Sequence, residues 1–174
     1  MLRAVVILGH GASGTAASMR PHVEGLHARG VEAEAVDLPK GRAERAVATF
    51  ARAARPHGAG VVVGGHSYGG RVASMLAAEQ PVAGLVLLSY PLHRPGHPED
   101  LRTEHWPRIA CPVLLLSGES DPFARIDLLR TAMPLLGDAR LVTYPRTGHG
   151  LSAVLDDALD HITAFVANLG VRAE

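Results

Sequence analysis

Val61-Val62-Val63-Gly64-Gly65-His66-Ser67-Tyr68-Gly69-Gly70-Arg71 is the stretch that decides the fold of this chain. A β-branched run ends in a glycine pair, a single serine follows, and a second glycine pair leads into apolar residues at helical spacing. The pattern predicts a strand that turns abruptly into a helix, with Ser67 at the tip of the turn. Because backbone segments approach closely in such a turn, Gly65 and Gly69 are needed where a side chain has no room.

The motif Gly65-x-Ser67-x-Gly69 has the form of a nucleophile elbow, in which a strained turn exposes a serine hydroxyl at the N-terminus of a helix. Backbone N–H groups at that helix end favour a developing negative charge. The alternative is a glycine-rich phosphate loop. It is disfavoured because the stretch has neither the lysine of G-x-x-x-x-G-K-[ST] nor the spacing of G-x-G-x-x-G.

The composition of the 174-residue chain bounds its function. Hydrophobic residues make up 47%, which is enough for one folded domain over residues 1–174. Basic and acidic residues both number 17 and aromatic residues make up only 4%, so nucleic-acid binding is disfavoured. Cys111 is the only cysteine, which fits a reducing cytoplasm. No stretch has the length of a membrane span or the form of a signal peptide, so no membrane partner is expected.

Apolar runs alternate with helical patterns along the whole chain. This alternation predicts an α/β fold with a doubly wound, mainly parallel six-stranded sheet and helices on both faces. The expected strands are residues 4–8, 31–36, 59–64, 85–88, 112–116 and 141–144, with 31–36 at a sheet edge. The expected helices are residues 15–30, 42–55, 68–80, 126–133 and 152–169. Ligands bind such sheets at the carboxyl ends of their strands.

Three residues that could form a catalytic triad follow apolar strands in the order Ser67, Asp121, His149. A serine hydroxyl needs a base, and the base needs a carboxylate that fixes its tautomer. Glu119 is the rival acid. Asp121 could instead cap a helix beginning at Pro122, and His149 could be an exposed loop residue. Its glycine neighbours and its place before the last helix favour a catalytic His149.

Two backbone N–H groups are expected to bind the oxyanion, those of Tyr68 and of Ala12 in the loop after the first strand. His10 is expected to bond that loop. Three further histidines lie between residues 90 and 111, and a polar rim is favoured over a zinc site, because neither cysteine nor helical spacing supports a metal. The remaining candidates, expected to be surface histidines and a small core cysteine, are His22, His27, His57, His161 and Cys111.

With these motifs the chain resembles the α/β-hydrolases, and within them the small proteins similar to dienelactone hydrolases. That group includes the testis-expressed hydrolase-like protein and a related domain of an NSL acetyltransferase-complex subunit. The resemblance implies a compact core without the superfamily's first two strands, with strand order 4-3-5-6-7-8 in its labels, and no cofactor. Tyr68 stands where the group more often has Met, which leaves its backbone role untouched. The residues that carry the resemblance are 10–12, 66–71, 89–93, 101–105 and 121–123.

Residues 90–111 occupy the place where this superfamily usually inserts a lid domain. They are rich in proline and carry only scattered apolar residues, so they cannot build a helical lid with its own core. We therefore expect a shallow, open site rimmed by His93, Arg94 and Tyr68. Such a site suits a small ester as the substrate, and the expected function is that of a serine hydrolase. The alternative is a non-catalytic interaction module, which has less reason to carry all three triad residues.

Overall fold

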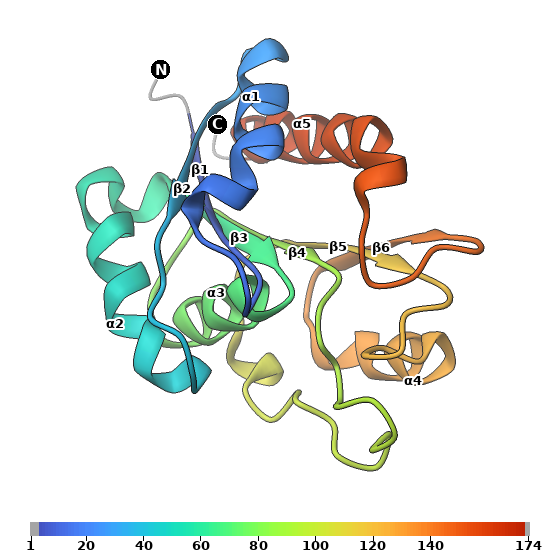
Figure 1. Ribbon diagram of the computed structural model, residues 1–174. Coiled ribbons are helices and arrows are strands. Elements are labelled where there is room, and N and C mark those ends of the chain that lie inside the picture. The colour runs from blue at the N-terminus through green and yellow to red at the C-terminus, as the bar shows by residue number, and fades with distance from the viewer. Residues whose placement is uncertain (1–3, 173–174) are drawn as a thin grey trace.

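A computed structural model describes residues 4–172, which fold around a sheet of six parallel strands (Figure 1). The order across the sheet is β2-β1-β3-β4-β5-β6. Every neighbouring pair is parallel. The predicted sheet is confirmed, and its order is the one implied by the resemblance. The strands are β1 (Val5–Gly9), β2 (Glu32–Val36), β3 (Val62–His66), β4 (Gly84–Leu88), β5 (Val113–Gly118) and β6 (Ala139–Tyr144).

Helices connect the strands in the predicted alternation. The α-helices are α1 (Arg20–Ala28), α2 (Ala43–Ala54), α3 (Tyr68–Glu79), α4 (Ile126–Ala132) and α5 (Leu155–Arg172). Short 3-10 helices are η1 (Ala16–Met19), η2 (Arg55–Gly60), η3 (Trp106–Arg108), η4 (Met133–Leu135) and η5 (Ser152–Val154). Between residues 4 and 172, no helix has both the length and the apolar character that crossing a bilayer requires.

Both faces of the sheet are covered (Figure 1). Successive side chains of a strand point to opposite faces, so in β1 Ile7 packs into one core while Val6 and Leu8 pack into the other. The first core is closed by α2, α3 and α4, and the second by α1 and α5. Burial on both faces explains why the central strands are continuous hydrophobic runs. The edge strand β2 instead exposes Glu32 and Glu34.

The strand before the elbow was predicted over residues 59–64, but it begins only at Val62. Pro56 is the second residue of η2, and Gly58 has a φ of 63° inside it. The turn closes with a hydrogen bond from the Val61 N–H to the Gly58 carbonyl, so strand pairing starts only at Val62. The strand then continues to His66, which places Ser67 directly at its end.

The chain between β4 and β5 forms no lid. It contains η3 and no α-helix, and its large apolar side chains other than the exposed Leu101 pack into the core beside α3 and α4. Trp106 and Tyr90 are fully buried there, with ring centroids 5.1 Å apart. The segment therefore extends the core at the edge of the sheet and leaves the strand ends uncovered.

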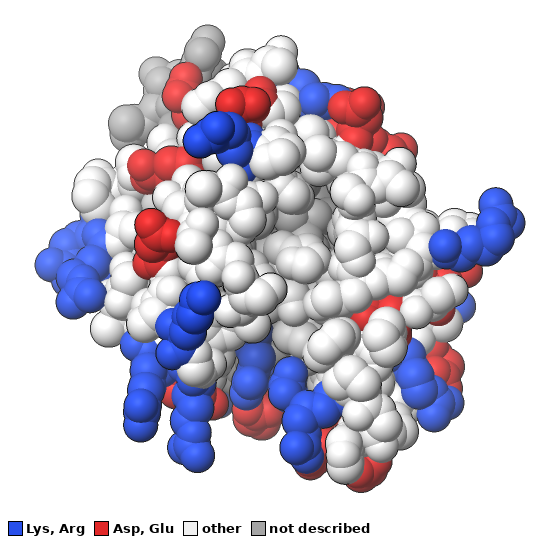
Figure 2. Space-filling model, viewed as in Figure 1, with Lys and Arg blue, Asp and Glu red and all other residues white. Residues whose placement is uncertain are grey.

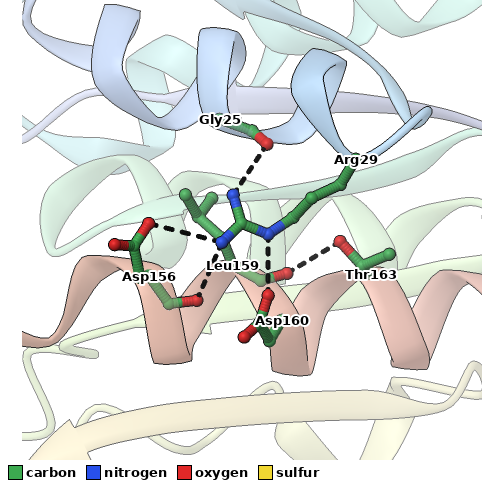
Figure 3. A network of polar contacts seen from close by, with 6 residues as sticks. All are labelled: Gly25, Arg29, Asp156, Leu159, Asp160 and Thr163. Atoms are coloured by element: carbon green, nitrogen blue, oxygen red, sulfur yellow. Dashed lines mark hydrogen bonds and ion pairs between the residues drawn. The ribbon is translucent and has the colours of Figure 1, made fainter.

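Arg29 fastens α1 to α5 (Figure 3). Its Nε donates to Asp160 Oδ1 at 2.8 Å, and its Nη1 donates to the Gly25 carbonyl at 3.0 Å. Its Nη2 donates to the side chain and the carbonyl of Asp156 at 3.3 and 3.4 Å. One guanidinium thus bonds two helices that are far apart in the sequence, which fixes their relative position.

We expect Arg29→Ala to lower the melting temperature, and Arg29→Lys to lower it as well, because an ammonium cannot reproduce the planar fork. The effect should be modest, since both aspartates are solvent-exposed and salt screens them. Differential scanning calorimetry at low and high salt measures it. Arg125→Ala is the control, because its pair with Asp127 joins residues only two apart. Equal melting temperatures for both alanine variants would contradict the clamp.

Candidate active site

Ser67 lies in the turn between β3 and α3 with a φ of 51°, a left-handed conformation that side-chain-bearing residues rarely adopt. A Cβ on Gly65 would lie 2.4 Å from the Gly9 carbonyl oxygen, and a Cβ on Gly69 would lie 2.2 Å from the Gly9 carbonyl carbon. The end of β1 therefore packs directly against the turn. Only glycine leaves room at both positions, as the motif predicts.

His149 bridges Ser67 and Asp121. Its Nε2 lies 2.8 Å from Ser67 Oγ, and its Nδ1 lies 2.8 Å from Asp121 Oδ2. Since a carboxylate only accepts hydrogen bonds, Nδ1 carries the proton and Nε2 is left to accept from the serine hydroxyl. The three side chains follow β3, β5 and β6, so the parallel sheet brings their loops to one edge. The predicted contact between Asp121 and His149 is present.

Asp121 is 3% exposed, and its second oxygen accepts from the Phe123 N–H at 2.8 Å. It does not cap a helix at Pro122, because α4 begins only at Ile126. The rival acid, Glu119, accepts instead from Thr143 Oγ1 at 2.8 Å and lies 3.7 Å from Arg130. Of the two acids, the geometry thus joins Asp121 to the histidine.

His66 and Phe123 hold His149 from two sides, and sequence reasoning assigned neither a role. His66 Nε2 donates to the His149 carbonyl at 3.1 Å, and the Phe123 ring centroid lies 4.4 Å from that of His149. Burial lowers the pKa of His66 below its ordinary value, so at pH 7 it is neutral and its single N–H is committed to this bond. The signal that could have found His66 is its place inside the G-x-S-x-G motif.

Ala12 and Tyr68, the expected oxyanion donors, both line the pocket in front of Ser67. Tyr68 is the first residue of α3, so its N–H has no acceptor within the helix. The loop of Ala12 is shaped by the buried His10, whose Nε2 accepts from the Leu38 N–H at 2.9 Å. Its Nδ1 therefore carries the proton and donates to the Gly11 carbonyl at 2.7 Å. His10 bonds loop backbone, as expected.

The pocket has a volume of about 1100 Å³, larger than the shallow site predicted from the missing lid. Its walls come from segments that flank the strand ends: Met19 and His22 from η1 and α1, and Leu151 and Leu155 around η5. Figure 2 shows a hollow near the middle of this face, with mostly uncharged side chains around it and Lys and Arg side chains below it. The helices fastened by Arg29 thus supply depth that no lid provides.

His93 and Arg94 do not line this pocket, although the sequence predicted them at its rim. His93 is 2% exposed, accepts from the Arg125 N–H at 3.1 Å and donates from Nδ1 to the Arg94 carbonyl at 2.9 Å. The Arg94 side chain is exposed and pairs with Asp100 at 3.4 Å. The imidazole turns inward because it satisfies backbone groups ahead of α4. Pro91 and Arg102 reach the pocket from this segment instead.

The other histidines of this segment do not gather around a metal. His105 is buried, with Nε2 2.7 Å from Ser74 Oγ, while His97 is exposed. Among the described residues, no group of three or more His, Cys, Asp or Glu side chains is arranged to hold a metal ion. Cys111 packs in the core, and burial raises the pKa of its thiol to about 11, so it is unreactive at neutral pH.

His22 was expected at the surface, but it lines the pocket. Its Nδ1 is buried, and no described residue forms a hydrogen bond with it. Burial, with a smaller effect of the nearby His66, lowers the pKa of His22 to about 4. The pocket thus contains an imidazole that is neutral throughout the physiological range.

This pKa predicts acid sensitivity. The unfolded chain binds a proton on His22 near pH 6.5 and the folded chain only near 4, so stability falls as the pH drops through that window. Between pH 7 and pH 4 we expect the wild type to lose roughly 2 kcal/mol more unfolding free energy than His22→Gln. Urea denaturation at the two pH values measures the difference. Equal losses would show that folding does not lower the pKa of His22.

Comparison with known proteins agrees with this fold. Residues 2–166 match the family model described as alpha/beta hydrolase domain. A monoacylglycerol lipase from Paleococcus ferrophilus is 16% identical with a TM-score of 0.82, covering 97% of this chain and 95% of that chain. Est1E from Butyrivibrio proteoclasticus is 16% identical with a TM-score of 0.80, covering 97% and 88%. A thermophilic esterase from Thermogutta terrifontis is 17% identical with a TM-score of 0.79, covering 95% and 90%. These solved structures share the fold of this chain. The family model matches most of the length of the chain, which shows that the chain belongs to the alpha/beta hydrolase domain family.

Proposed function

We propose that this protein is a serine hydrolase that cleaves a small ester or a related acyl bond through an acyl-enzyme intermediate. The observation that carries the proposal is the pair of 2.8 Å contacts that join Ser67 to His149 and His149 to Asp121. A serine hydroxyl is a weak nucleophile until a base lies within hydrogen-bond reach. The lipase and the esterases of the same fold support this class of reaction.

In the proposed first step, Ser67 Oγ attacks the ester carbonyl carbon while its proton passes to His149 Nε2. Asp121 keeps the imidazole in the Nδ1–H tautomer and stabilises the imidazolium that forms. The N–H groups of Ala12 and Tyr68 donate to the oxyanion. His149 then protonates the departing alcohol, which leaves the acyl group on Ser67.

Water completes the cycle. His149 accepts a proton from the water molecule, the hydroxide attacks the acyl carbon, and the Ser67 oxygen leaves and recovers its proton from His149. The ester and one water are thereby converted into an acid and an alcohol. No cofactor is required, because every proton moves between the substrate, water and the two side chains.

The proposal includes a narrower relationship, to the small dienelactone-hydrolase-like and testis-expressed hydrolase-like proteins. Residues 89–93 and 101–105, two of the segments that carry this resemblance, are hydrogen-bonded to each other. The Tyr90 hydroxyl donates to the Arg102 carbonyl at 2.7 Å, and the Arg102 N–H donates to the Leu92 carbonyl at 2.8 Å. We further propose that residues 1–174 act as one domain in the cytoplasm, which suits a chain with a single cysteine.

A fluorophosphonate probe tests the proposal directly, because it reacts with a serine that an adjacent base activates. The wild type should be labelled and Ser67→Ala should not. Ser13→Ala is the matched control, since Ser13 lines the same pocket but no described residue serves it as a base. Labelling that persists in Ser67→Ala would assign the reactive nucleophile to another residue. No labelling of the wild type, together with no turnover of any ester, would favour the interaction module.

Chain-length preference is a second expected outcome. Arginine, histidine and serine side chains line part of the pocket beside apolar ones, so a long acyl chain would displace water from some polar groups as well as bury apolar surface. Each added methylene should then gain less than the ~0.8 kcal/mol of full burial. We expect kcat/KM to be higher for p-nitrophenyl acetate and butyrate than for octanoate and palmitate, without activation by micelles. A steady rise toward palmitate would contradict this expectation.

A further inference from the structure

Three arginines line the pocket in front of Ser67, and the proposed chemistry uses none of them: Arg42, Arg71 and Arg102. Arg42 is exposed to solvent, whereas Arg71 and Arg102 are partly buried. Arg71 belongs to α3, and its N–H donates to the Ser67 carbonyl at 3.0 Å, so it lies one helical turn from the serine. Arg102 comes from the chain between β4 and β5, where its backbone is bonded to Leu92 and to the Tyr90 hydroxyl. Both side chains are thus carried by ordered backbone.

Neither guanidinium is fully satisfied by protein groups. Arg71 Nε is buried, and no described residue accepts a hydrogen bond from it. Arg71 Nη2 lies 3.6 Å from Glu44, a carboxylate that is 57% exposed. Arg102 Nη1 reaches only the Pro91 carbonyl, at 3.4 Å. A buried N–H group is ordinarily paired, so Arg71 Nε has room for an acceptor that the described residues do not supply.

The two cations also act on each other. Burial, and after it the positive charge of Arg71, lowers the pKa of Arg102. Like charges held together at the wall of a pocket are unfavourable unless an anion lies between them. Glu44 offsets only part of this charge from its exposed position. The arrangement therefore favours a negatively charged occupant.

We propose that the ester substrate carries a carboxylate and that Arg71 and Arg102 bind it, an inference that rests on the proposed hydrolase activity. The planar guanidinium fork matches two carboxylate oxygens. Because Glu44 offsets part of the positive charge, one carboxylate group with its single charge suits the two guanidinium groups better than a doubly charged phosphate group does. The substrates of this class are half-esters of dicarboxylic acids and esters of hydroxy acids.

Isosteric pairs of substrates test this inference. In each pair a carboxylate is compared with the neutral carboxamide of the same shape: monoethyl succinate, glutarate and adipate for the acyl side, and 2-acetoxyacetate for the alcohol side. We expect kcat/KM to favour the carboxylate by about 10- to 100-fold in at least one pair, a size typical of a hydrogen-bonded charge. Equal values in all pairs would overturn the proposal.

Variants assign the preference to these residues. Arg102→Gln should reduce the ratio of carboxylate to carboxamide turnover roughly tenfold, and Arg102→Glu should reverse it. The matched control is Arg94→Gln, which removes an exposed arginine from the same segment that does not line the pocket. The ratio should not change in this control. A preference that survives Arg102→Glu would contradict the assignment.

Binding without turnover separates this inference from the activity on which it rests. Succinate should raise the melting temperature of Ser67→Ala and should raise it less in Ser67→Ala/Arg102→Gln. If the fluorophosphonate fails to label the wild type while succinate still stabilises Ser67→Ala, the hydrolase proposal falls and the anion site stands. Labelling without any carboxylate preference or succinate binding overturns the anion site alone. Tighter binding of inorganic phosphate than of succinate would overturn the choice of carboxylate.

Arg102→Lys covers the case in which Arg102→Gln fails to fold. It keeps the positive charge but loses the planar fork. We expect Arg102→Lys to retain part of the carboxylate preference in turnover. In binding, Ser67→Ala/Arg102→Lys should bind succinate more weakly than Ser67→Ala does. A preference equal to that of the wild type would show that the fork is not used.

Discussion

Replacing Ser67 or His149 by alanine is expected to lower kcat by on the order of 10³- to 10⁶-fold. Ser67→Ala removes the nucleophile, and His149→Ala removes the base that lies 2.8 Å from the serine hydroxyl. The residual rate should come from binding and the backbone oxyanion donors. Steady-state hydrolysis of p-nitrophenyl acetate measures the loss, with circular dichroism to confirm that each variant is folded.

The double variant makes this test specific to a shared mechanism. Because each single change already disables the proton transfer, Ser67→Ala/His149→Ala should lose little more activity than either single variant. If the two losses multiply, the residues do not act as a unit. A rate within tenfold of the wild type for Ser67→Ala would remove this serine from the mechanism.

Gly69→Ala is expected to destabilise the protein by roughly 3 kcal/mol or more, the largest expected effect on stability. A Cβ at this position would lie 2.2 Å from the carbonyl carbon and 2.7 Å from the Cα of Gly9, so α3 and β1 would have to move apart. Helix propensity alone predicts the opposite sign, a gain of up to about 1 kcal/mol for alanine over glycine. The sign of the change therefore decides between the two effects.

Gly60→Ala is the matched control, because Gly60 ends η2 just before β3, whereas Gly69 lies in α3 just after it. A Cβ there meets nothing within 4 Å, and the residue does not have a positive φ. We expect its unfolding free energy to stay within about 0.5 kcal/mol of the wild type, as for most surface substitutions. Urea denaturation compares the two variants. If Gly69→Ala is as stable as Gly60→Ala, β1 does not pack tightly against the elbow.

Local patterns were sufficient to predict the sheet, the elbow and the contact among Ser67, Asp121 and His149. Each of these depends on features within a few residues of one another: an apolar run, a glycine pair, a polar residue at a strand end. In a parallel sheet the carboxyl ends of all strands meet at one edge, so residues far apart in sequence are brought together without further information. Even the late start of β3 has a local cause, the turn at Pro56 and Gly58.

The walls of the pocket were decided only by the tertiary structure. His22 enters the pocket because α1 lies against α5, a contact that rests on their shared core and that Arg29 reinforces through two aspartates more than a hundred residues away. His93 turns away because it accepts from the Arg125 N–H, while Arg102 of the same segment faces the site. A loop side chain points where its hydrogen-bond partners lie, and those partners come from other parts of the chain. The sequence thus determined where the candidate catalytic residues meet, and long-range packing determined which other side chains line the pocket beside them.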